Sequence, residues 1–223
     1  MNAAAQSVNA ILARIVNGLS IDIDAAAEAH LYRFTALIAR WNRVHNLTSA
    51  KTPQQIALRH VGDCLSVVPA VTDGWALDLG SGAGLPGIVL GICRPQLSVV
   101  LLDASRKRTA FCVQVCGELG LSNVEAVHSR IEDFGHRSAA DHAESGFDWV
   151  LTRGYGSLAD CWRASCPQLR LGGALVAMKG KLPQRELAEL GELGENARTE
   201  TVAVPGLAEE RHMVIVRKNR NNR

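Results

Sequence analysis

The sequence predicts an α/β fold, with a mostly parallel seven-stranded sheet, an antiparallel terminal hairpin and an N-terminal helical cap. Beyond residue 75, short apolar runs alternate with helical stretches, as in β-α-β units. Before it, only helical periodicity is found. The last two apolar runs are too close for a helical crossover, so they must pair antiparallel. The 223 residues, 47% of them hydrophobic, suit a helical extension (1–70) and one α/β domain (71–223).

Three helices are expected in the extension, because apolar residues recur there at helical spacing. Gly18 is a plausible end for the first helix. Asp22 or Asp24 can cap the second, and Pro53 suits the first turn of the third. The three apolar stripes are Ile11, Leu12, Ile15, Val16 and Leu19; Leu31, Phe34, Ile38 and Trp41; and Ile56, Leu58, Val61 and Leu65.

Seven strands are expected after the extension. A helix should begin near Pro86 and lead into the second strand, and another should carry Phe111, Val115 and Leu119 after it. The expected strands cover residues 75–79, 98–102, 123–127, 147–151, 174–178, 201–204 and 213–216.

A glycine-rich segment follows the first expected strand. Residues 77–87 read Leu-Asp-Leu-Gly-Ser-Gly-Ala-Gly-Leu-Pro-Gly, and Gly82-x-Gly84-x-x-Gly87 matches the dinucleotide fingerprint. Asp103 follows at the spacing of about 20 residues at which an acid binds the ribose hydroxyls of a nucleoside. A nicotinamide enzyme is therefore one candidate, and a tight turn without any ligand is another.

The longer pattern Asp78-x-Gly80-x-Gly82-x-Gly84 favours S-adenosylmethionine as the cofactor. This molecule carries no phosphate, so the glycines would instead let the backbone approach its methionine and adenosine parts. Asp78 could orient the cofactor's amino group, and Asp103 could accept hydrogen bonds from both ribose hydroxyls. The chain is also too short for a separate substrate domain beside the sheet.

The sequence resembles the RsmG (GidB) family of 16S ribosomal RNA guanine-N7 methyltransferases over roughly residues 41 to 218. The matching segments keep the family's order along the chain. They are Trp41-Asn42, Asn46-Leu47-Thr48, Arg59-His60, Gly84-Leu85-Pro86-Gly87, Leu101-Leu102-Asp103, Lys107-Arg108, Ser129-Arg130-Ile131-Glu132, Thr152-Arg153, Met178-Lys179-Gly180 and Glu210-Arg211-His212.

The resemblance implies a Rossmann-like class I methyltransferase domain with S-adenosylmethionine as cofactor. The family's cofactor-contacting loop residues correspond to Gly80 and Leu85, its adenine-side pair to Ile131 and Glu132, and its arginine after the fourth strand to Arg153. One segment departs from the family pattern. Where the family has Ser-Arg-Ala, this chain reads Thr-Arg-Gly-Tyr-Gly over residues 152–156.

Methylation of guanine N7 requires no general base, because this nitrogen has a free lone pair at neutral pH. Catalysis would rest on proximity and alignment, worth at best about 7–11 kcal/mol. We expect Arg153, at a strand's carboxyl end, to contact guanine O6, a phosphate or the methionine carboxylate, and Lys179 to contact a phosphate. We therefore name Arg153 and Lys179 as the candidate catalytic residues.

Other activities are also compatible with the motif. The same fold could methylate a small molecule or a protein, or could bind a nucleotide in a regulatory module without transferring a group. Cys166-Pro167 could suggest a nucleophile for C5 methylation, but a helix that ends before proline explains this pair. The histidines show no metal-ligand spacing, and the six cysteines are expected to be reduced and mostly buried.

Charge placement is more informative than the net charge of +2. Two acid-free basic segments, one in the cap and one at the C-terminus, could hold the phosphates of 16S ribosomal RNA or of the small ribosomal subunit. Without a signal peptide or an apolar run that could span a membrane, we expect a cytoplasmic monomer. The basic residues are Arg33, Arg40, Arg43, Lys51 and Arg59 in the cap, and Arg211, Arg217, Lys218, Arg220 and Arg223 at the C-terminus.

Overall fold

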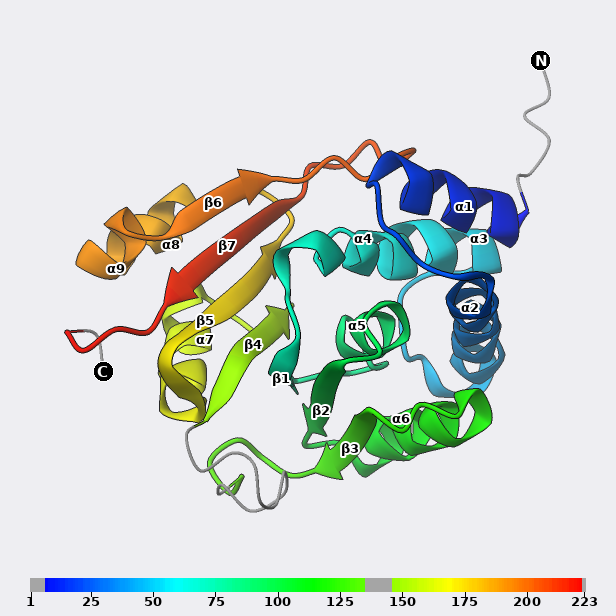
Figure 1. Cartoon of the computed structure of the whole chain (residues 1–223), viewed down its shortest axis with the longest axis horizontal. Helices are drawn as coiled ribbons and strands as arrows, with labels where there is room; N and C mark the ends of the chain where they lie inside the picture. Colours follow the sequence, from blue (N-terminus) through cyan, green and yellow to red (C-terminus); the bar gives the residue numbers. More distant parts are fainter. Residues whose placement is uncertain (1–6, 135–145, 222–223) are drawn as a thin grey trace.

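A computed structural model of the chain describes residues 7–134 and 146–221. Its seven-stranded sheet has the order β3-β2-β1-β4-β5-β7-β6 (Figure 1). Neighbouring strands pair in parallel except β7, which is antiparallel to both β5 and β6. This confirms the predicted sheet and its terminal hairpin. The strands are β1 (Gly74–Leu79), β2 (Leu97–Asp103), β3 (Val124–His128), β4 (Phe147–Arg153), β5 (Leu169–Lys179), β6 (Arg198–Thr201) and β7 (His212–Arg217).

The helices begin where the sequence supplies caps. Asp24 accepts a hydrogen bond from the backbone N–H of Ala27 at the start of α2, and Ser157 forms a capping box with Asp160 in α7. The α-helices are α1 (Val8–Gly18), α2 (Ala25–His45), α3 (Pro53–Ile56), α4 (Gly62–Leu65), α5 (Gly87–Cys93), α6 (Arg106–Leu119), α7 (Leu158–Ser165), α8 (Gln184–Glu189) and α9 (Glu192–Glu195); short 3-10 turns, η2 and η3, cover Val68–Ala70 and Cys166–Gln168.

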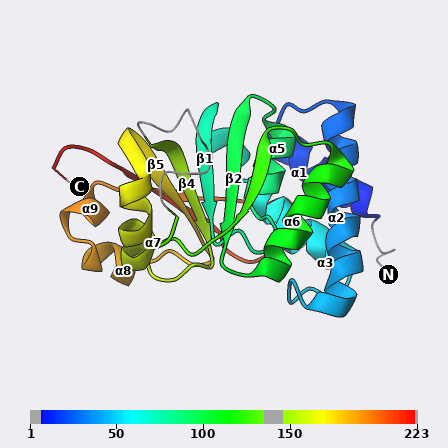
Figure 2. The same cartoon turned by 90° about the horizontal axis from the view of Figure 1, so that it is seen from below.

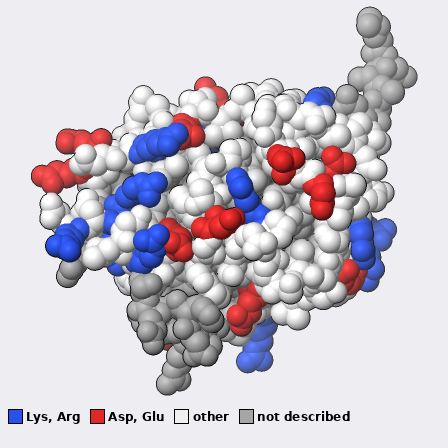
Figure 3. Space-filling view, viewed as in Figure 1, with Lys and Arg blue, Asp and Glu red and all other residues white. Residues whose placement is uncertain are grey.

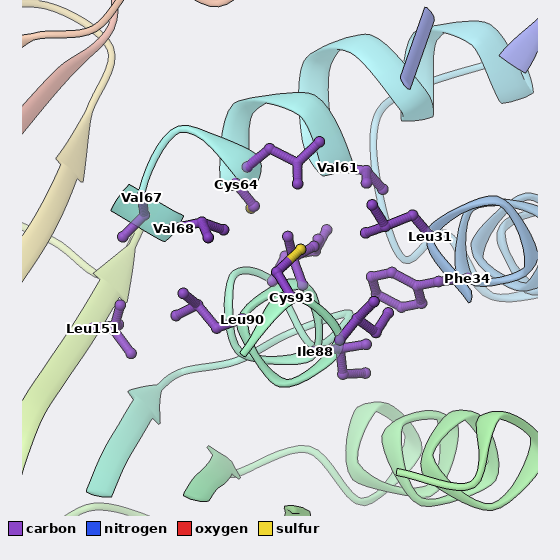
Figure 4. Close-up of a cluster of buried hydrophobic side chains, with 14 of the residues drawn as sticks. Leu31, Phe34, Val61, Cys64, Val67, Val68, Ile88, Leu90, Cys93 and Leu151 are labelled. Carbon is purple, nitrogen blue, oxygen red and sulfur yellow. The ribbon is translucent and has the colours of Figure 1, made fainter. Parts of the chain in front are cut away.

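The N-terminal helices pack on one face of the sheet and share its core. Figure 4 shows Leu31 and Phe34 of α2 facing Ile88 of α5, with Val61 and Cys64 above them. All five side chains are fully buried. Helices α2, α5 and α6 lie on one side of the strands and α7 on the other (Figure 2). The cap is therefore joined to the α/β part by one continuous apolar core, which fixes the position of its polar residues relative to the sheet.

The third helix of the cap contains a π turn that the sequence did not predict. The turn, η1, covers Ala57–Val61 between α3 and α4, and the N–H of Gly62 donates to the carbonyl of Ala57. Arg59 and His60 lie on this turn. Because π turns are frequently found at functional sites, Arg59, His60 and their neighbours are candidates for the site.

The sixth strand was predicted at residues 201–204 but lies at Arg198–Thr201. The apolar residues that suggested the later position serve another contact. Val204 is only 4% exposed and belongs to the core formed with the cap, and Val202 packs against that core. Burial against the helices explains their hydrophobicity, so this part of the prediction was wrong.

Most of the cysteine side chains are buried, as the sequence predicts. Cys64, Cys93, Cys112, Cys161 and Cys166 are buried and Cys116 is partly buried, and within the described residues none of the six forms a disulfide. Among the described residues, no helix is both long and apolar enough to cross a membrane.

Candidate active site

The glycine loop and Asp103 meet at the carboxyl ends of β1 and β2. Asp103 Oδ2 accepts a hydrogen bond of 2.8 Å from the N–H of Gly82, and Oδ1 accepts one of 2.8 Å from the N–H of Ser105. The backbone of Gly82 and Gly84 is left-handed, with φ of 58° and 74°. The loop therefore turns back onto Asp103 in a conformation that glycine adopts without strain.

Asp78 lies beneath this loop and is fully buried. Its Oδ2 accepts a hydrogen bond of 2.7 Å from the N–H of Gly87, the first residue of α5. Its Oδ1 has no hydrogen-bond partner among the described residues. Burial raises the pKa of Asp78 to about 7, although the Gly87 N–H and Arg153 oppose that shift. Asp78 thus supports the loop and keeps one oxygen without a partner.

A cavity of about 290 Å³ opens beside the loop. Gly80 and Asp103 form one side of it, and the predicted adenine-side pair, Ile131 and Glu132, forms another. Tyr155 lines it too and lies so close to Gly80 that a Cβ there would be 2.9 Å from the ring. Four predicted cofactor residues therefore meet at one cavity. The side chain of Leu85 is instead buried in the core, and Gly84 packs against Ile88.

A second cavity, of about 380 Å³, adjoins the first, and Gly154 lines both. Its polar wall includes Arg153 and Arg211, whereas Met178 and Met213 supply apolar surface. Such a combination can stack a flat ring between apolar groups while guanidinium donors bond its acceptors.

A buried carboxylate organises the arginines of the second cavity. Asp63 Oδ1 accepts a hydrogen bond of 2.9 Å from Arg211 Nε, and Oδ2 accepts one of 3.3 Å from Arg153 Nη1. His60 Nδ1 lies 3.4 Å from both Nη atoms of Arg153. Burial, together with Arg153, Arg211 and Arg59, lowers the pKa of His60 to about 4. His60 is therefore neutral at pH 7, and its Nδ1 accepts a hydrogen bond from the guanidinium of Arg153.

Lys179 also lines the second cavity, but its ammonium group is engaged within the protein. The group donates to the carbonyl of Gly156 at 2.7 Å and pairs with Glu186 Oε2 at 2.8 Å. Lys179 therefore holds the segment that departs from the family pattern. Its predicted phosphate contact stays a prediction.

Asp63 was not identified from the sequence as a site residue, and His60 was noted only within the Arg59-His60 match to the family. The signal was nevertheless present. Asp63 lies between Val61 and Leu65 of the predicted apolar stripe, and an acid that is buried among such residues has to be paired. Tyr155 was noted only as a departure from the family, yet it forms a wall of the first cavity.

The structure argues against Cys166 as a nucleophile for C5 methylation. Cys166 is buried, which raises the pKa of its thiol, and it precedes β5, so it lies at the opposite edge of the sheet from Arg153. It is not placed as a nucleophile for this site. Among residues 7–134 and 146–221, no group of three or more His, Cys, Asp or Glu side chains could hold a metal ion.

The C-terminal cations mostly contact the protein itself. Arg211 pairs with Asp63, Lys218 donates to the carbonyls of Cys166 and Leu169, and Arg217 donates to Gly172. Arg223 lies outside the described residues. The C-terminal segment therefore offers fewer cations for phosphates than its composition suggests.

Comparison with known proteins identifies the family. The model of the GidB family, rRNA small subunit methyltransferase G, matches residues 27–214. The protein of that name from Methylobacillus flagellatus is 38% identical, over 90% of this chain and 94% of its own. The one from Stenotrophomonas maltophilia is 40% identical, over 92% and 94%. This chain belongs to the GidB family.

The fold of this GidB family member also matches solved methyltransferases. The O-methyltransferase TomG from Streptomyces achromogenes, solved in complex with SAM, superposes with a TM-score of 0.58 at 16% identity, over 96% of this chain and 100% of its own. The Rossmann-like class I methyltransferase fold is thereby confirmed. The nicotinamide, regulatory and ligand-free readings of the glycine loop lose their support in a chain that belongs to a methyltransferase family.

Proposed function

We propose that this protein transfers a methyl group from S-adenosylmethionine to N7 of a guanine in 16S ribosomal RNA. One observation of the structure carries the proposal. The cavity beside the glycine loop and the arginine-lined cavity share Gly154, so a methyl donor in the first would face a base in the second. Membership of the rRNA small subunit methyltransferase G family supports the reaction and the substrate class.

The residues of the first cavity fit the cofactor. Asp103 keeps lone pairs on both carboxylate oxygens beyond the two backbone hydrogen bonds it accepts, so it can receive ribose hydroxyls. Glu132 and Ile131 stand where an adenine edge would lie. The unpartnered Oδ1 of Asp78 offers an acceptor toward the amino group, through water or after a small movement of the loop. When bound, the cofactor supplies an electrophilic methyl group on a sulfonium.

The residues of the second cavity fit a guanine. Arg153 is held by Asp63 and His60, so its guanidinium is fixed before a base arrives. A fixed guanidinium can donate a hydrogen bond to guanine O6, which is next to N7. The N7 lone pair would then point past Gly154 toward the first cavity, where the methyl donor is proposed to bind. Because N7 carries no proton, the neutral His60 is not needed as a base, and alignment is the protein's main contribution.

The decisive test is methyl transfer to small ribosomal subunits and to naked 16S RNA, both prepared from cells that lack this protein. Labelled methyl should appear in the RNA, and mass spectrometry should locate it as 7-methylguanine. No labelled product with either substrate, despite binding of S-adenosylmethionine, would contradict the proposal. We propose that the protein acts in the cytoplasm and that it is a monomer. Sedimentation of the purified chain would test the monomeric state.

The cofactor site is tested by substituting Asp103→Asn. Loss of charged hydrogen bonds to the ribose should weaken S-adenosylmethionine binding roughly 10- to 100-fold. Isothermal titration against S-adenosylmethionine and NAD measures both affinity and cofactor choice. Asp73→Asn is the matched control, since Asp73 is exposed and precedes β1, at the opposite end of that strand from Gly80 and the cavity. Equal affinities in the two variants would remove Asp103 from the site.

A further inference from the structure

A groove outside the two cavities carries a cluster of basic side chains. It lies between the C-terminal half of α2 and residues 46–53, and its volume is about 540 Å³. Arg40, Arg43 and Lys51 line it together with Tyr32, which is 46% exposed. None of its lining residues is acidic. We call it the cap groove.

The three cations of the cap groove are unpaired. Within residues 7–134 and 146–221, the side chains of Arg40, Arg43 and Lys51 form no ion pair and no hydrogen bond, and all three are exposed. The other basic residues of the cap differ. Arg33 donates to the carbonyl of Glu118 at 3.0 Å, and Arg59 pairs with Glu209 at 2.7 Å. Two of the five cations in the basic cap segment therefore contact the protein itself, and the three in the cap groove could contact an anionic ligand.

The walls of the cap groove are fixed by hydrogen bonds. Asn42 Nδ2 donates to the carbonyl of Ala50 at 2.8 Å, and Asn42 Oδ1 accepts from the N–H of Thr48 at 2.7 Å. Thr52 then caps α3 through the N–H of Gln55. These contacts hold the segment that carries Lys51 against the helix that carries the two arginines. Binding of a ligand would therefore cost little conformational entropy in these two backbone segments.

This arrangement of like charges is unfavourable without a counterion. Arg40 and Arg43 are three residues apart on one helix, where equal charges repel. No acid occurs between Glu28 and Asp63 that could offset them. By contrast, acids lie among the cations over β6 and β7 (Figure 3), as in the pair Arg198–Glu200. A polyanion is the ligand that would relieve the repulsion in the cap groove.

The cap groove lies toward the same edge of the sheet as the active site. Arg33, in the first half of α2, bonds the carbonyl of Glu118 at the end of α6, whereas Trp41, in the second half, packs against Phe111, nearer the start of α6. The two helices are thus antiparallel. Since α6 begins just after Asp103, the end of α2 points to the edge of the sheet that holds the cofactor residues.

One continuous helical stretch also links the two regions. Residue Ile56 lines the cap groove, and His60 and Asp63 line the arginine cavity. Seven residues of helix rise about 10 Å. That separation is short compared with the surface that a folded RNA covers.

We propose that the cap groove binds the sugar–phosphate backbone of the RNA substrate, one or more nucleotides away from the methylated guanine. The inference rests on the proposed function and extends it by naming a second contact. Arg40, Arg43 and Lys51 each neutralise a phosphate, and Tyr32 offers a face on which an unpaired base stacks. Phosphate contacts of this kind position the RNA without reading its sequence.

The test compares the wild type with the triple variant Arg40→Gln, Arg43→Gln, Lys51→Gln, using unmodified 16S RNA and small subunits as probes. Three lost contacts at about 0.7 each should reduce the slope of log affinity against log salt by about 2. Raising salt from 50 to 200 mM should then weaken the wild type roughly 20-fold more than the variant. KM for the RNA should rise, whereas kcat at saturating RNA and the affinity for S-adenosylmethionine should not change.

The matched control is Arg163→Gln, Arg185→Gln, Arg198→Gln, which removes the same charge. These cations are 77%, 93% and 75% exposed and sit in surface ion pairs. An unchanged KM and salt slope in the groove variant, or an equal change in the control, would overturn the cap groove as an RNA site while leaving the methyltransferase intact. Absence of methylation by the wild type would instead contradict the proposed function.

Discussion

Asp63 and Arg153, 90 residues apart in the sequence, form a buried ion pair with 3.3 Å between Oδ2 and Nη1. The same carboxylate holds Arg211 through its other oxygen. One acid from the helical cap thus fixes two guanidinium groups, one at the carboxyl end of β4 and one just before β7. Through this contact the cap contributes Asp63 to the wall of the cavity that Arg153 and Arg211 line.

Asp63→Asn should lower both stability and turnover. Removing one partner of a buried pair leaves uncompensated charge, so we expect a loss on the order of 3 kcal/mol in the free energy of unfolding. Turnover should also fall, because Arg153 loses its fixed orientation. Urea denaturation and single-turnover methylation measure the two effects. Glu189→Gln, which breaks the exposed pair with Arg185, should cost much less stability than Asp63→Asn; equal losses would contradict a special role for Asp63.

His60 should make stability depend on pH below neutrality. Its pKa is about 4 in the folded protein, against 6.5 for an ordinary histidine. Between these values the unfolded chain binds more protons, so the free energy of unfolding falls as the pH drops, by at most about 1.4 kcal/mol per pH unit. Asp78, with a pKa raised to about 7, acts in the opposite direction.

The contribution of His60 is therefore isolated by comparing the wild type with His60→Gln at each pH, since Asp78 is common to both. The wild type should lose stability relative to the variant from pH 6.5 down to pH 4, and the difference should level off below that. Parallel stability curves over this range would show that His60 protonates as readily in the folded protein as in the unfolded chain.

Gly84→Ala should disturb the loop more than Gly82→Ala. Both glycines have positive φ, so alanine strains either position by roughly 1–2 kcal/mol. A Cβ on Gly84 would also lie 2.2 Å from Cδ1 of Ile88, whereas one on Gly82 would have no atom closer than 3.9 Å. Gly84→Ala should therefore have the lower unfolding temperature and the lower affinity for S-adenosylmethionine of the two variants, as measured by thermal unfolding and titration. The reverse order would contradict the expected clash between the new Cβ and the side chain of Ile88.

Lys179→Gln separates an anchoring role from a phosphate contact. If Lys179 holds Gly156 and Glu186, as the structure has it, the substitution should lower kcat and stability and leave the salt dependence of RNA binding unchanged. If Lys179 binds a phosphate during the reaction, the salt slope should fall by about 0.7. Filter binding at several salt concentrations, alongside thermal unfolding, distinguishes the two.

Local sequence determined most of the elements and identified the residues that are proposed to bind the nucleoside of the cofactor. Alternating apolar runs predict strands because a parallel sheet is buried on both faces, and capping residues such as Asp24 mark helix starts. Gly80 and Asp103 could be assigned because a nucleoside imposes a fixed spacing between loop and acid, and both lie at the same cavity. Such signals depend on contacts within a few residues or on one β-α-β unit.

Only the tertiary structure decided which polar groups meet. Nothing near Asp63 in the sequence names Arg153 and Arg211 as its partners, since the pairing depends on how the cap packs against the sheet. The hydrophobic residues near Val204 suggested a strand, but their burial against the cap gives them another reason to be apolar. Likewise, the sequence shows five cations in the basic segment of the cap. Only the structure shows that Arg33 and Arg59 are engaged within the protein, whereas Arg40, Arg43 and Lys51 could contact a ligand. Long-range pairing of charges depends on packing, because hydrophobic burial is the dominant favourable contribution to folding and determines which charged side chains lie close to one another.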